Sequence, residues 1–549
     1  MREFYIKNKP LIILWLLCIA ALIGFMGHYS NILLDVGREV YYPQRILEGK
    51  VLYKDLFNIY GPFSYLWNAF LYKIFGINLR ALYISGAICS LAIVSGVYLI
   101  ARRFLNTSLS FAIGLFTIVT GVCANHLFNY TFPYSWAMLY GTVGFLYSVY
   151  FLVKYKDSEN PNFLYLSGLL AGFAIVNKYD FFIYGAFLFL ISLFTKNKKN
   201  ILNFITSFMV FPILSFGILF LQGLRIDDLI SAMGEVHKMM NAKTLEYFYT
   251  NQGVIFTPTV IPVWFKNFLT TGIPLGLMML SYRFYEKIKI VSITLITIFA
   301  LVGYKLLSPA LFAFLTPLLF LVSILGYKKI KNNLPLMLVI ISAIGASFKT
   351  FWGLTPMSYG CYYTPIVLIA FFGVLFAFIN EKYQKIAAIF LTVASVSFLS
   401  VYTYKRTLTT GKISSPHGTI YTYEQQADNI NNVLSILNND ENTNSTALVY
   451  PEGMIINFLS KNNVKSDDYY NSLIPLYFES MGEDNFIKVL NEKKPKFVIL
   501  NSQSMSDYYF EHICTNYAFN FCEQINQDYT EEADFNGVVS YKVYRRNQP

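Results

Sequence analysis

The sequence predicts a polytopic α-helical membrane protein with about 13 transmembrane helices and a C-terminal extracytoplasmic α/β domain. Of its 549 residues, 55% are hydrophobic and only 14% are charged, whereas about a quarter of the residues in soluble proteins are charged. Apolar runs of roughly 17–22 residues recur as far as residue 402, and each is long enough to cross about 30 Å of hydrocarbon. Residues 403–549 are polar, and this length is sufficient for an independent domain.

The first apolar run, Leu11 to Gly27, follows three basic residues and is similar to a signal peptide in composition. No small-residue cleavage site follows it, so we interpret it as a retained first helix. The twelve further spans are predicted at approximately 81–101, 108–123, 134–153, 162–176, 181–195, 201–221, 263–281, 288–304, 307–326, 333–349, 362–379 and 386–402.

Basic residues alternate from one side of the predicted membrane to the other. Seven segments on the side of the N-terminus carry 18 Lys and Arg, whereas the four short turns on the opposite side hold only Lys178, Lys305 and Lys349. Short cytoplasmic loops carry the excess of Lys and Arg, so the N-terminus is predicted to be cytoplasmic. Three long segments then face the exterior, namely 28–80, 222–262 and 403–549.

The net charge of +11 is divided unevenly along the chain. Residues 1–402 hold 31 Lys and Arg against 14 Asp and Glu, and residues 403–549 hold 12 against 18. A nucleic-acid-binding protein gathers positive charge on a polar surface, but here it lies in short loops between apolar runs. No nucleic-acid partner is therefore expected.

The polar tail is predicted to be an α/β domain. Residues 422–439 have the apolar spacing of a helix, and "TALVYPEG", "KFVILN" and "VVSYKVYRR" have the composition of strands. The chain contains no glycine-rich nucleotide loop and no zinc-type Cys and His spacing. Cys514 and Cys522 allow either a disulfide or two buried thiols.

The first outer segment contains the most informative residues. Asp35 follows the first span at the expected headgroup boundary, and Glu39 shares its face if a helix continues there. The run 63–75 is amphipathic and too short to span, so we expect it to lie on the membrane surface. Other polar and aromatic candidates in this segment are Arg38, Tyr53, Lys54 and Asp55.

The stretches "RILEGKVLYKD" and "YGPFSYLWNAFLYKIFG", with Asp35 before them, resemble the first periplasmic loop of bacterial GT-C glycosyltransferases. Within this superfamily, the stretches resemble the bacterial family that is related to protein O-mannosyltransferases and to lipid A aminoarabinose transferases. "GLLAGFAIVNKYD" is similar to the Gly-rich span ending in Lys that these proteins carry. The resemblance implies a GT-C-like catalytic module over residues 1–402 and an extracytoplasmic domain over 403–549.

The resemblance also implies an activity. A monosaccharide would pass, with inversion, from a polyprenyl-phosphate donor to an acceptor at the outer face of a bacterial inner membrane. The acceptor would be lipid A, a glycolipid, a polysaccharide or a protein. Direct displacement needs a general base, for which Asp35 is the candidate, and cations that stabilise the leaving phosphate. Candidate phosphate or substrate partners are Arg38, Glu39, Tyr53, Lys54, Asp55, Lys178, Asp180, Arg225 and Lys349.

Each of these residues also has an ordinary structural interpretation. Asp35 is well suited to cap a surface helix, Asp55 to start a turn, and Glu39 to pair with Arg38 or Lys50 in solvent. Lys178 and Asp180 are close enough in sequence to neutralise each other, and Arg225 and Lys349 are typical of interfacial positions. Residues 222–262 form either a flexible cover over a lipid substrate or a solvated amphipathic helix.

The chain departs from the superfamily pattern in two places. Val36 follows Asp35 where many eukaryotic relatives have adjacent Asp and Glu, and the second outer loop, "NHLFNYTFPYS", offers His126 but no carboxylate. No cofactor is assigned, and a divalent metal stays an open alternative. Two other function classes also stay open: a transporter or flippase of lipid-linked sugars, and an inactive scaffold.

Overall fold

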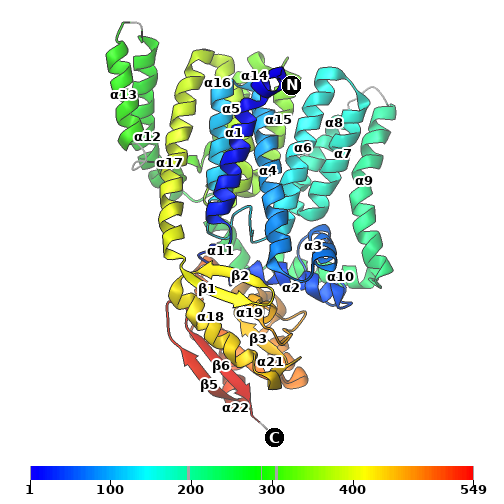
Figure 1. Ribbon diagram of the computed structural model, residues 1–549. Coiled ribbons are helices and arrows are strands. Elements are labelled where there is room, and N and C mark those ends of the chain that lie inside the picture. The colour runs from blue at the N-terminus through cyan, green and yellow to red at the C-terminus, as the bar shows by residue number, and fades with distance from the viewer. Residues whose placement is uncertain (1, 194–197, 286, 303–306, 548–549) are drawn as a thin grey trace.

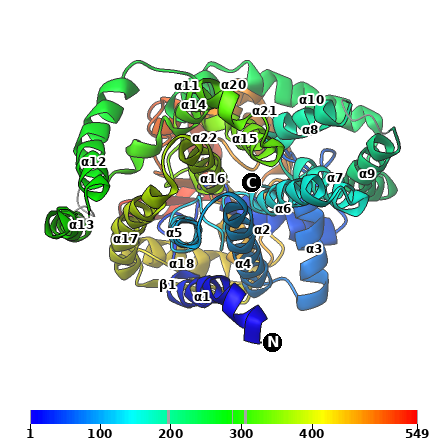
Figure 2. The same cartoon turned by 90° about the horizontal axis from the view of Figure 1, so that it is seen from above.

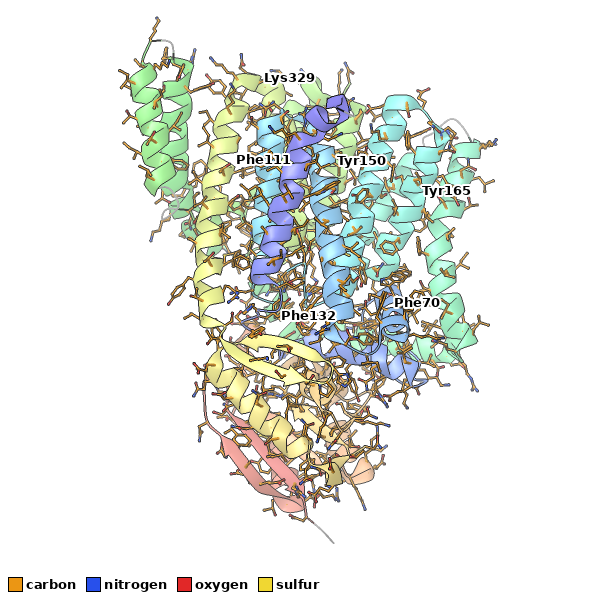
Figure 3. The ribbon with its side chains drawn as sticks, viewed as in Figure 1. Phe70, Phe111, Phe132, Tyr150, Tyr165 and Lys329 are labelled. Carbon is orange, nitrogen blue, oxygen red and sulfur yellow. A yellow bond between two sulfur atoms is a disulfide. The ribbon has the colours of Figure 1, made fainter. Side chains whose placement is uncertain are left out.

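The computed structural model describes residues 2–193, 198–285, 287–302 and 307–547. It contains a long bundle of helices with a smaller α/β part at one end (Figure 1). The N-terminus lies at the opposite end of the bundle from the α/β part, and Lys329 marks the same far end (Figure 3).

Every apolar run predicted from the sequence overlaps a helix of the structure. These helices are α1 (Arg2–Phe25), α4 (Leu79–Phe104), α5 (Thr107–Thr117, continued by a π-helical turn Ile118–Val122), α6 (Trp136–Ser158), α7 (Pro161–Asn177), α8 (Phe182–Leu193), α9 (Lys198–Leu221), α12 (Val260–Arg283), α13 (Lys289–Val302), α14 (Leu315–Ile330), α15 (Leu334–Ala346), α16 (Gly360–Phe378) and α17 (Gln384–Leu408).

The apolar helices make this a multi-pass membrane protein. Among the described residues, seven helical segments are long and apolar enough to cross a membrane. One is residues 8–25 of α1, and the others contain α4, α6, α9, α14, α16 and α17. Five shorter apolar helices accompany them, so thirteen crossings stay a prediction. Parts of the predicted spans 181–195 and 288–304, and Lys305 between two spans, lie outside the described residues.

Local sequence explains where several of these helices begin. The side chains of Asn78, Asn106 and Ser135 accept hydrogen bonds from backbone N–H groups in the first turns of α4, α5 and α6. At the start of α7, Asn160 does the same, and Pro161 occupies the first helical position, where no N–H is needed. These caps fix the entry points of the bundle helices.

Four further helices gather at the end of the bundle that faces the α/β part (Figures 1 and 2). They are α2 (Val36–Leu47), α3 (Phe63–Phe75), α10 (Ile226–Met240) and α11 (Lys243–Asn251). Phe70 and Ile74 of α3 are exposed, and Phe70 is marked on this helix in Figure 3. An exposed apolar face on a short helix is typical of a helix at a membrane surface.

The C-terminal part is built on a four-stranded sheet of order β3-β4-β6-β5. β3 (Ala447–Tyr450) and β4 (Phe497–Asn501) are parallel, and β6 (Tyr541–Arg546) pairs antiparallel with β4 and with β5 (Tyr529–Phe535). A hairpin of β1 (Gly411–Ser415) and β2 (Gly418–Thr422) precedes it. The helices are α18 (Glu424–Leu437), α19 (Met454–Leu459), α20 (Pro475–Met481), α21 (Glu483–Lys493) and α22 (Phe519–Asp528).

The sequence correctly predicted α18, β3, β4 and β6. It did not reveal β1, β2 and β5. β5 contains Glu531, Glu532 and Asp534, and most of its residues lie at the surface of the sheet. The choice left open for Cys514 and Cys522 is also settled, because the two residues form a disulfide.

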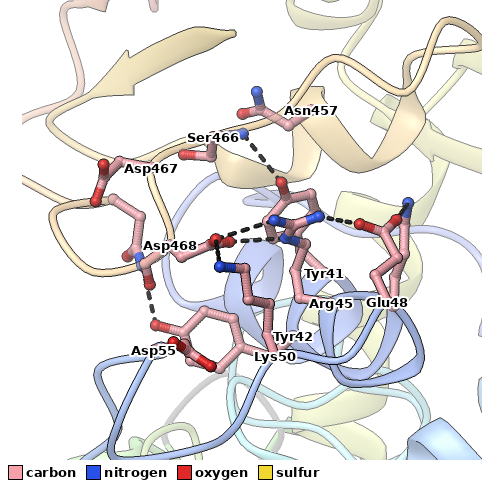
Figure 4. Close-up of polar contacts among 12 residues, drawn as sticks. Tyr41, Tyr42, Arg45, Glu48, Lys50, Asp55, Asn457, Ser466, Asp467 and Asp468 are labelled. Carbon is pink, nitrogen blue, oxygen red and sulfur yellow. Dashed lines mark hydrogen bonds and ion pairs between the residues drawn. The ribbon is translucent and has the colours of Figure 1, made fainter. Parts of the chain in front are cut away.

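Polar contacts join α2 to the C-terminal part (Figure 4). The Arg45 guanidinium donates two hydrogen bonds to the Asp468 carboxylate, at 2.7 and 2.9 Å. Tyr41 Oη accepts from the Ser466 N–H, and the Asn471 side-chain amide donates to Tyr42 Oη. Figure 4 shows these side chains reaching from α2 to the loop that contains Asp468. The first outer segment is therefore fixed against the C-terminal part.

Candidate functional site

A cavity of about 200 Å³ lies where the bundle, the outer helices and the C-terminal part meet. α2 contributes Arg38, with Asp35 just before it, and α10 and α11 contribute Met239 and Phe248. The C-terminal part contributes Glu452 and Tyr508. Segments separated by more than 400 residues thus form one partly open cavity with both apolar and charged walls.

Asp35 occupies the position before the first residue of α2. Its side chain makes no capping hydrogen bond to the helix. Instead, its carboxylate accepts from Arg38 Nη2 at 2.8 Å, and about a third of the side chain is exposed. Asp35 is therefore held by one cation while it remains accessible from the cavity.

Glu39 lies behind this pair and is fully buried. Its carboxylate accepts from Tyr65 Oη at 2.5 Å and from the Trp136 backbone N–H at 2.7 Å. Its Oε1 also lies 3.6 Å from Arg38 Nε. Glu39 consequently connects α2, α3 and the start of α6 and orients Arg38, and it is not one of the residues that line the cavity.

Tyr60 is in contact with two cations. The Lys178 ammonium is 3.2 Å from the centre of its ring, and the Arg38 guanidinium is 5.0 Å from that centre. Lys178 is in the turn between α7 and α8, outside the predicted spans, and is 3% exposed. Burial lowers the pKa of its ammonium to about 7, although the charge of Asp180 acts in the opposite direction.

Gly61 explains how Tyr60 reaches this position. The Gly61 N–H donates to the Asn177 carbonyl at 3.0 Å. A Cβ at residue 61 would lie only 1.8 Å from the Val176 carbonyl oxygen, so any side chain would push the two segments apart. The missing Cβ therefore allows the first outer segment to pack against the end of α7.

Lys349 of the bundle also lines the cavity. It follows α15 in a short 3₁₀ turn, Phe348–Thr350, and its ammonium lies 3.4 Å from Asp180 Oδ2. Tyr363 Oη donates to the same oxygen at 3.1 Å. Burial alone lowers the pKa of Lys349, but the charge of Asp180 and the neighbouring tyrosines have the larger effect and raise the pKa above its usual value. The group therefore stays a cation. Asp180 is thus the ion-pair partner of Lys349 rather than of Lys178.

The structure does not bring Tyr53, Asp55 and Arg225 into the lining of this cavity. Tyr53 Oη donates to the Tyr60 carbonyl at 2.6 Å, so it supports the Tyr60 loop. Asp55 accepts from the Val51 N–H within a turn. Arg225 is exposed at the start of α10, and the exposed Lys54 donates to the Gly223 carbonyl.

Glu452 is a cavity residue that sequence reasoning missed. It lies two residues after the end of β3 and precedes Gly453, and its Oε2 accepts from the Asp35 backbone N–H at 2.9 Å. An acidic residue at the carboxyl end of a parallel strand was the available signal. The residues of "TALVYPEG" were assigned only to a strand, so Glu452 was not considered.

The long outer segment 222–262 covers the cavity. The first two backbone N–H groups of α11 donate to the Glu479 carboxylate, at 2.8 and 3.0 Å, which attaches this helix to α20. After α11, a Cβ at Gly253 would lie 2.3 Å from Gly353 Cα. These contacts fix α11 at both of its ends, against the C-terminal part and against the segment that follows Lys349.

His126, the polar candidate of the second outer loop, is engaged in local hydrogen bonds. No three His, Cys, Asp or Glu side chains among the described residues are gathered closely enough to hold an ion. His126 Nδ1 accepts from the Phe128 N–H, and its Nε2 lies 3.2 Å from Tyr402 Oη. Burial lowers the pKa of His126 to about 3, so the ring is neutral and used in local hydrogen bonds.

Comparisons with solved structures give overall likenesses at low sequence identity. ArnT from Cupriavidus metallidurans bound to undecaprenyl phosphate is 10% identical, with a TM-score of 0.49 and 98% of each chain covered. The oligosaccharyltransferase AglB from Archaeoglobus fulgidus, in complex with an inhibitory peptide and a dolichol-phosphate, is 13% identical with a TM-score of 0.49. That alignment covers all of this chain and 75% of AglB. No curated protein sequence matches the chain.

A comparison with protein families gives a direct match in sequence. Residues 61–218 match the family described as dolichyl-phosphate-mannose-protein mannosyltransferase. The matched residues include "YGPFSYLWNAFLYKIFG" from its second residue onward and "GLLAGFAIVNKYD", two of the stretches on which the resemblance was based. The match confirms that resemblance over residues 61–218, where the chain is similar to this mannosyltransferase family.

Proposed function

We propose that this protein transfers a monosaccharide from a polyprenyl-phosphate donor to an acceptor hydroxyl at the outer face of a bacterial inner membrane. The N-terminus is then cytoplasmic and the C-terminal part lies outside. The observation that carries the proposal is the cavity in which Asp35, Arg38 and Lys349 meet below apolar side chains of α10 and α11. Such walls suit a donor that has an isoprenoid chain, a phosphate and a sugar.

Asp35 is the proposed general base. The acceptor oxygen attacks the anomeric carbon, and the carbon–oxygen bond to the lipid phosphate breaks with its electron pair leaving on the phosphate. Asp35 takes the hydroxyl proton as the new bond forms, from the face opposite the leaving group, so the anomeric configuration inverts. Its partial exposure in the cavity permits this contact.

Arg38, Lys178 and Lys349 are the proposed phosphate partners. Negative charge develops on the leaving phosphate, and fixed cations in a largely enclosed site stabilise it more strongly than water does. Arg38 and Lys349 line the cavity directly. Lys178 lies behind the Tyr60 ring, which also lines it.

No residue described above distinguishes one acceptor class from another. The assay must therefore offer lipid A, glycolipids, polysaccharides and proteins as acceptors. The test is release of free lipid phosphate by purified protein in liposomes. Undecaprenyl-phosphate and dolichyl-phosphate monosaccharides are supplied with membrane extracts as the acceptor source. We expect release by the wild type and its loss in Asp35→Asn. A transporter or a scaffold releases no lipid phosphate, and its action tolerates the same substitution.

A further inference from the structure

The Asp35 backbone depends on a side chain from the C-terminal part. Asp35 has a φ of +58° and a ψ of −40°, a conformation that residues other than glycine adopt rarely and at a cost. Its N–H donates to Glu452 Oε2 at 2.9 Å. This hydrogen bond joins the start of α2 to the loop after β3, and both side chains face the same cavity.

The hydrogen bonds around Glu452 indicate which protonation state the site favours. Ser472 Oγ lies 3.1 Å from the Pro451 carbonyl oxygen and 3.3 Å from Glu452 Oε1. A hydroxyl has only one hydrogen to donate. If Glu452 is neutral, its O–H donates to Ser472 Oγ, the Ser472 hydroxyl donates to the Pro451 carbonyl, and Oε2 accepts from Asp35.

An ionised Glu452 is accommodated less well. The Ser472 hydroxyl must then turn away from the Pro451 carbonyl, and two carboxylates share one largely enclosed cavity. Two charged groups of the first outer segment, Asp35 and Arg38, lie near Glu452. The titratable groups of the C-terminal part around it are Tyr477, Asp507, Tyr508 and Tyr517, and Lys349 of the bundle lines the same cavity. Burial and the charge of Asp35 raise the pKa of Glu452 to about 8, against the opposing charge of Arg38.

We propose that Glu452 is the positioning residue of Asp35, and that it holds the proton of this carboxyl pair so that Asp35 alone carries the negative charge. This inference rests on the proposed function, because it assigns Glu452 a role in the same reaction. With this role for Glu452, the C-terminal part is a component of the active site, because Glu452 holds the backbone conformation of Asp35 and leaves the negative charge on the Asp35 carboxylate.

The test compares Glu452→Gln with Glu452→Ala. A glutamine amide accepts from the Asp35 N–H and donates to Ser472 Oγ, as a neutral carboxyl group does, whereas alanine does neither. We expect Glu452→Ala to lower kcat for lipid-phosphate release about 100-fold with little change in KM, and Glu452→Gln to restore most of that loss at pH 7. Equal losses in both variants would overturn the proposal.

The pH profile separates this role from a merely structural one. In the wild type, kcat falls above pH 8 as Glu452 loses its proton. In Glu452→Gln this alkaline decrease is absent, because the amide does not titrate. If kcat falls in the same way above pH 8 in the wild type and in Glu452→Gln, Glu452 does not hold the proton.

A measurement without substrate keeps this inference separate from the proposed function. A carboxyl pKa that is raised by folding stabilises the protein at low pH, and that stability is lost as the pH rises through the folded-state pKa. The melting temperature of the wild type is therefore expected to fall between pH 5 and pH 9 relative to that of Glu452→Gln. Glu424→Gln, at an exposed position of α18, is the matched control and should follow the wild type. Parallel curves for wild type and Glu452→Gln would contradict the proposal, even if no donor proved active.

Discussion

The ammonium of Lys178 lies 3.2 Å from the centre of the Tyr60 ring. One face of the cavity wall is therefore an aromatic ring with a buried cation behind it. Cation–π contact partly compensates for the lost hydration of the ammonium. The low pKa of Lys178 places its change of charge close to neutral pH.

Lys178 gives the first prediction, a pH dependence of donor binding. The ammonium is charged below its pKa, so its attraction for phosphate is present at pH 6 and declines as the pH passes 7. We expect KM for the donor to rise by up to about tenfold between pH 6 and pH 8, since one unit above its pKa about a tenth of a group stays protonated. Steady-state kinetics across this range measure the effect.

Lys178→Arg is the variant that checks the cause. Arginine keeps its charge throughout this range, so the rise in KM should disappear. Arg225→Met removes an exposed cation outside the cavity lining and should leave the wild-type pH dependence in place. If KM rises equally in Lys178→Arg and in the wild type, Lys178 is not the titrating group.

A second prediction concerns Gly61. A methyl group at this position would overlap the Val176 carbonyl oxygen, so the backbone of one segment must move. We expect Gly61→Ala to lower the free energy of unfolding by about 3 kcal/mol, at the upper end of overpacking effects. It should also lower lipid-phosphate release by displacing Tyr60.

The matched glycine is Gly234 of α10, where the backbone is helical and no neighbouring atom lies within 4 Å of the position that a Cβ would take. Gly234→Ala should be neutral or slightly stabilising, because alanine is the better helix former. Thermal unfolding in detergent compares the two variants. Similar melting temperatures for both would show that the Gly61 contact is not tight.

A third prediction concerns the bidentate contact between Arg45 and Asp468. Both side chains are mostly buried, at 7% and 17% exposure, and removal of Asp468 leaves the buried Arg45 guanidinium paired with Glu48 alone among the described residues. We expect Asp468→Asn to cost about 3 kcal/mol of unfolding free energy. Lys542→Met breaks an exposed pair with Glu531 and should cost less than about 1 kcal/mol. Equal costs would mean that α2 is not held by this contact.

The sequence was sufficient for the helices and for part of the site, for identifiable physical reasons. Apolar runs long enough to cross a membrane give a strong signal, so each run was matched by a helix, although individual helix ends differ from the prediction by up to nine residues. Arg38 and Lys349 were candidates because the charge pattern placed them on the outer side. Asp35 was a candidate because it follows the first span in a segment that resembles GT-C glycosyltransferases. All three line the cavity.

Other features depend on contacts between distant segments and have no local signal. Glu452 reaches Asp35 across 417 positions of the chain. The pairing of Asp180 with Lys349 rather than with Lys178 depends on how α15 packs beside α8. Glu39, next to Arg38 in sequence, is turned into the protein interior by its hydrogen bonds to Tyr65 and Trp136. Only the packed structure separates cavity residues from those that support them.

Asp35→Asn tests the central claim most directly, since it removes the proposed base and retains the side-chain shape. The measurement is mass-spectrometric detection of free lipid phosphate released from polyprenyl-phosphate sugars in liposomes, for wild type and variant with equal melting temperatures. The account predicts release by the wild type and a loss of about 100- to 10,000-fold in the variant, the range that a general base contributes. Equal release by both proteins would contradict the role of Asp35, and no release by either from any donor would contradict the proposed transfer.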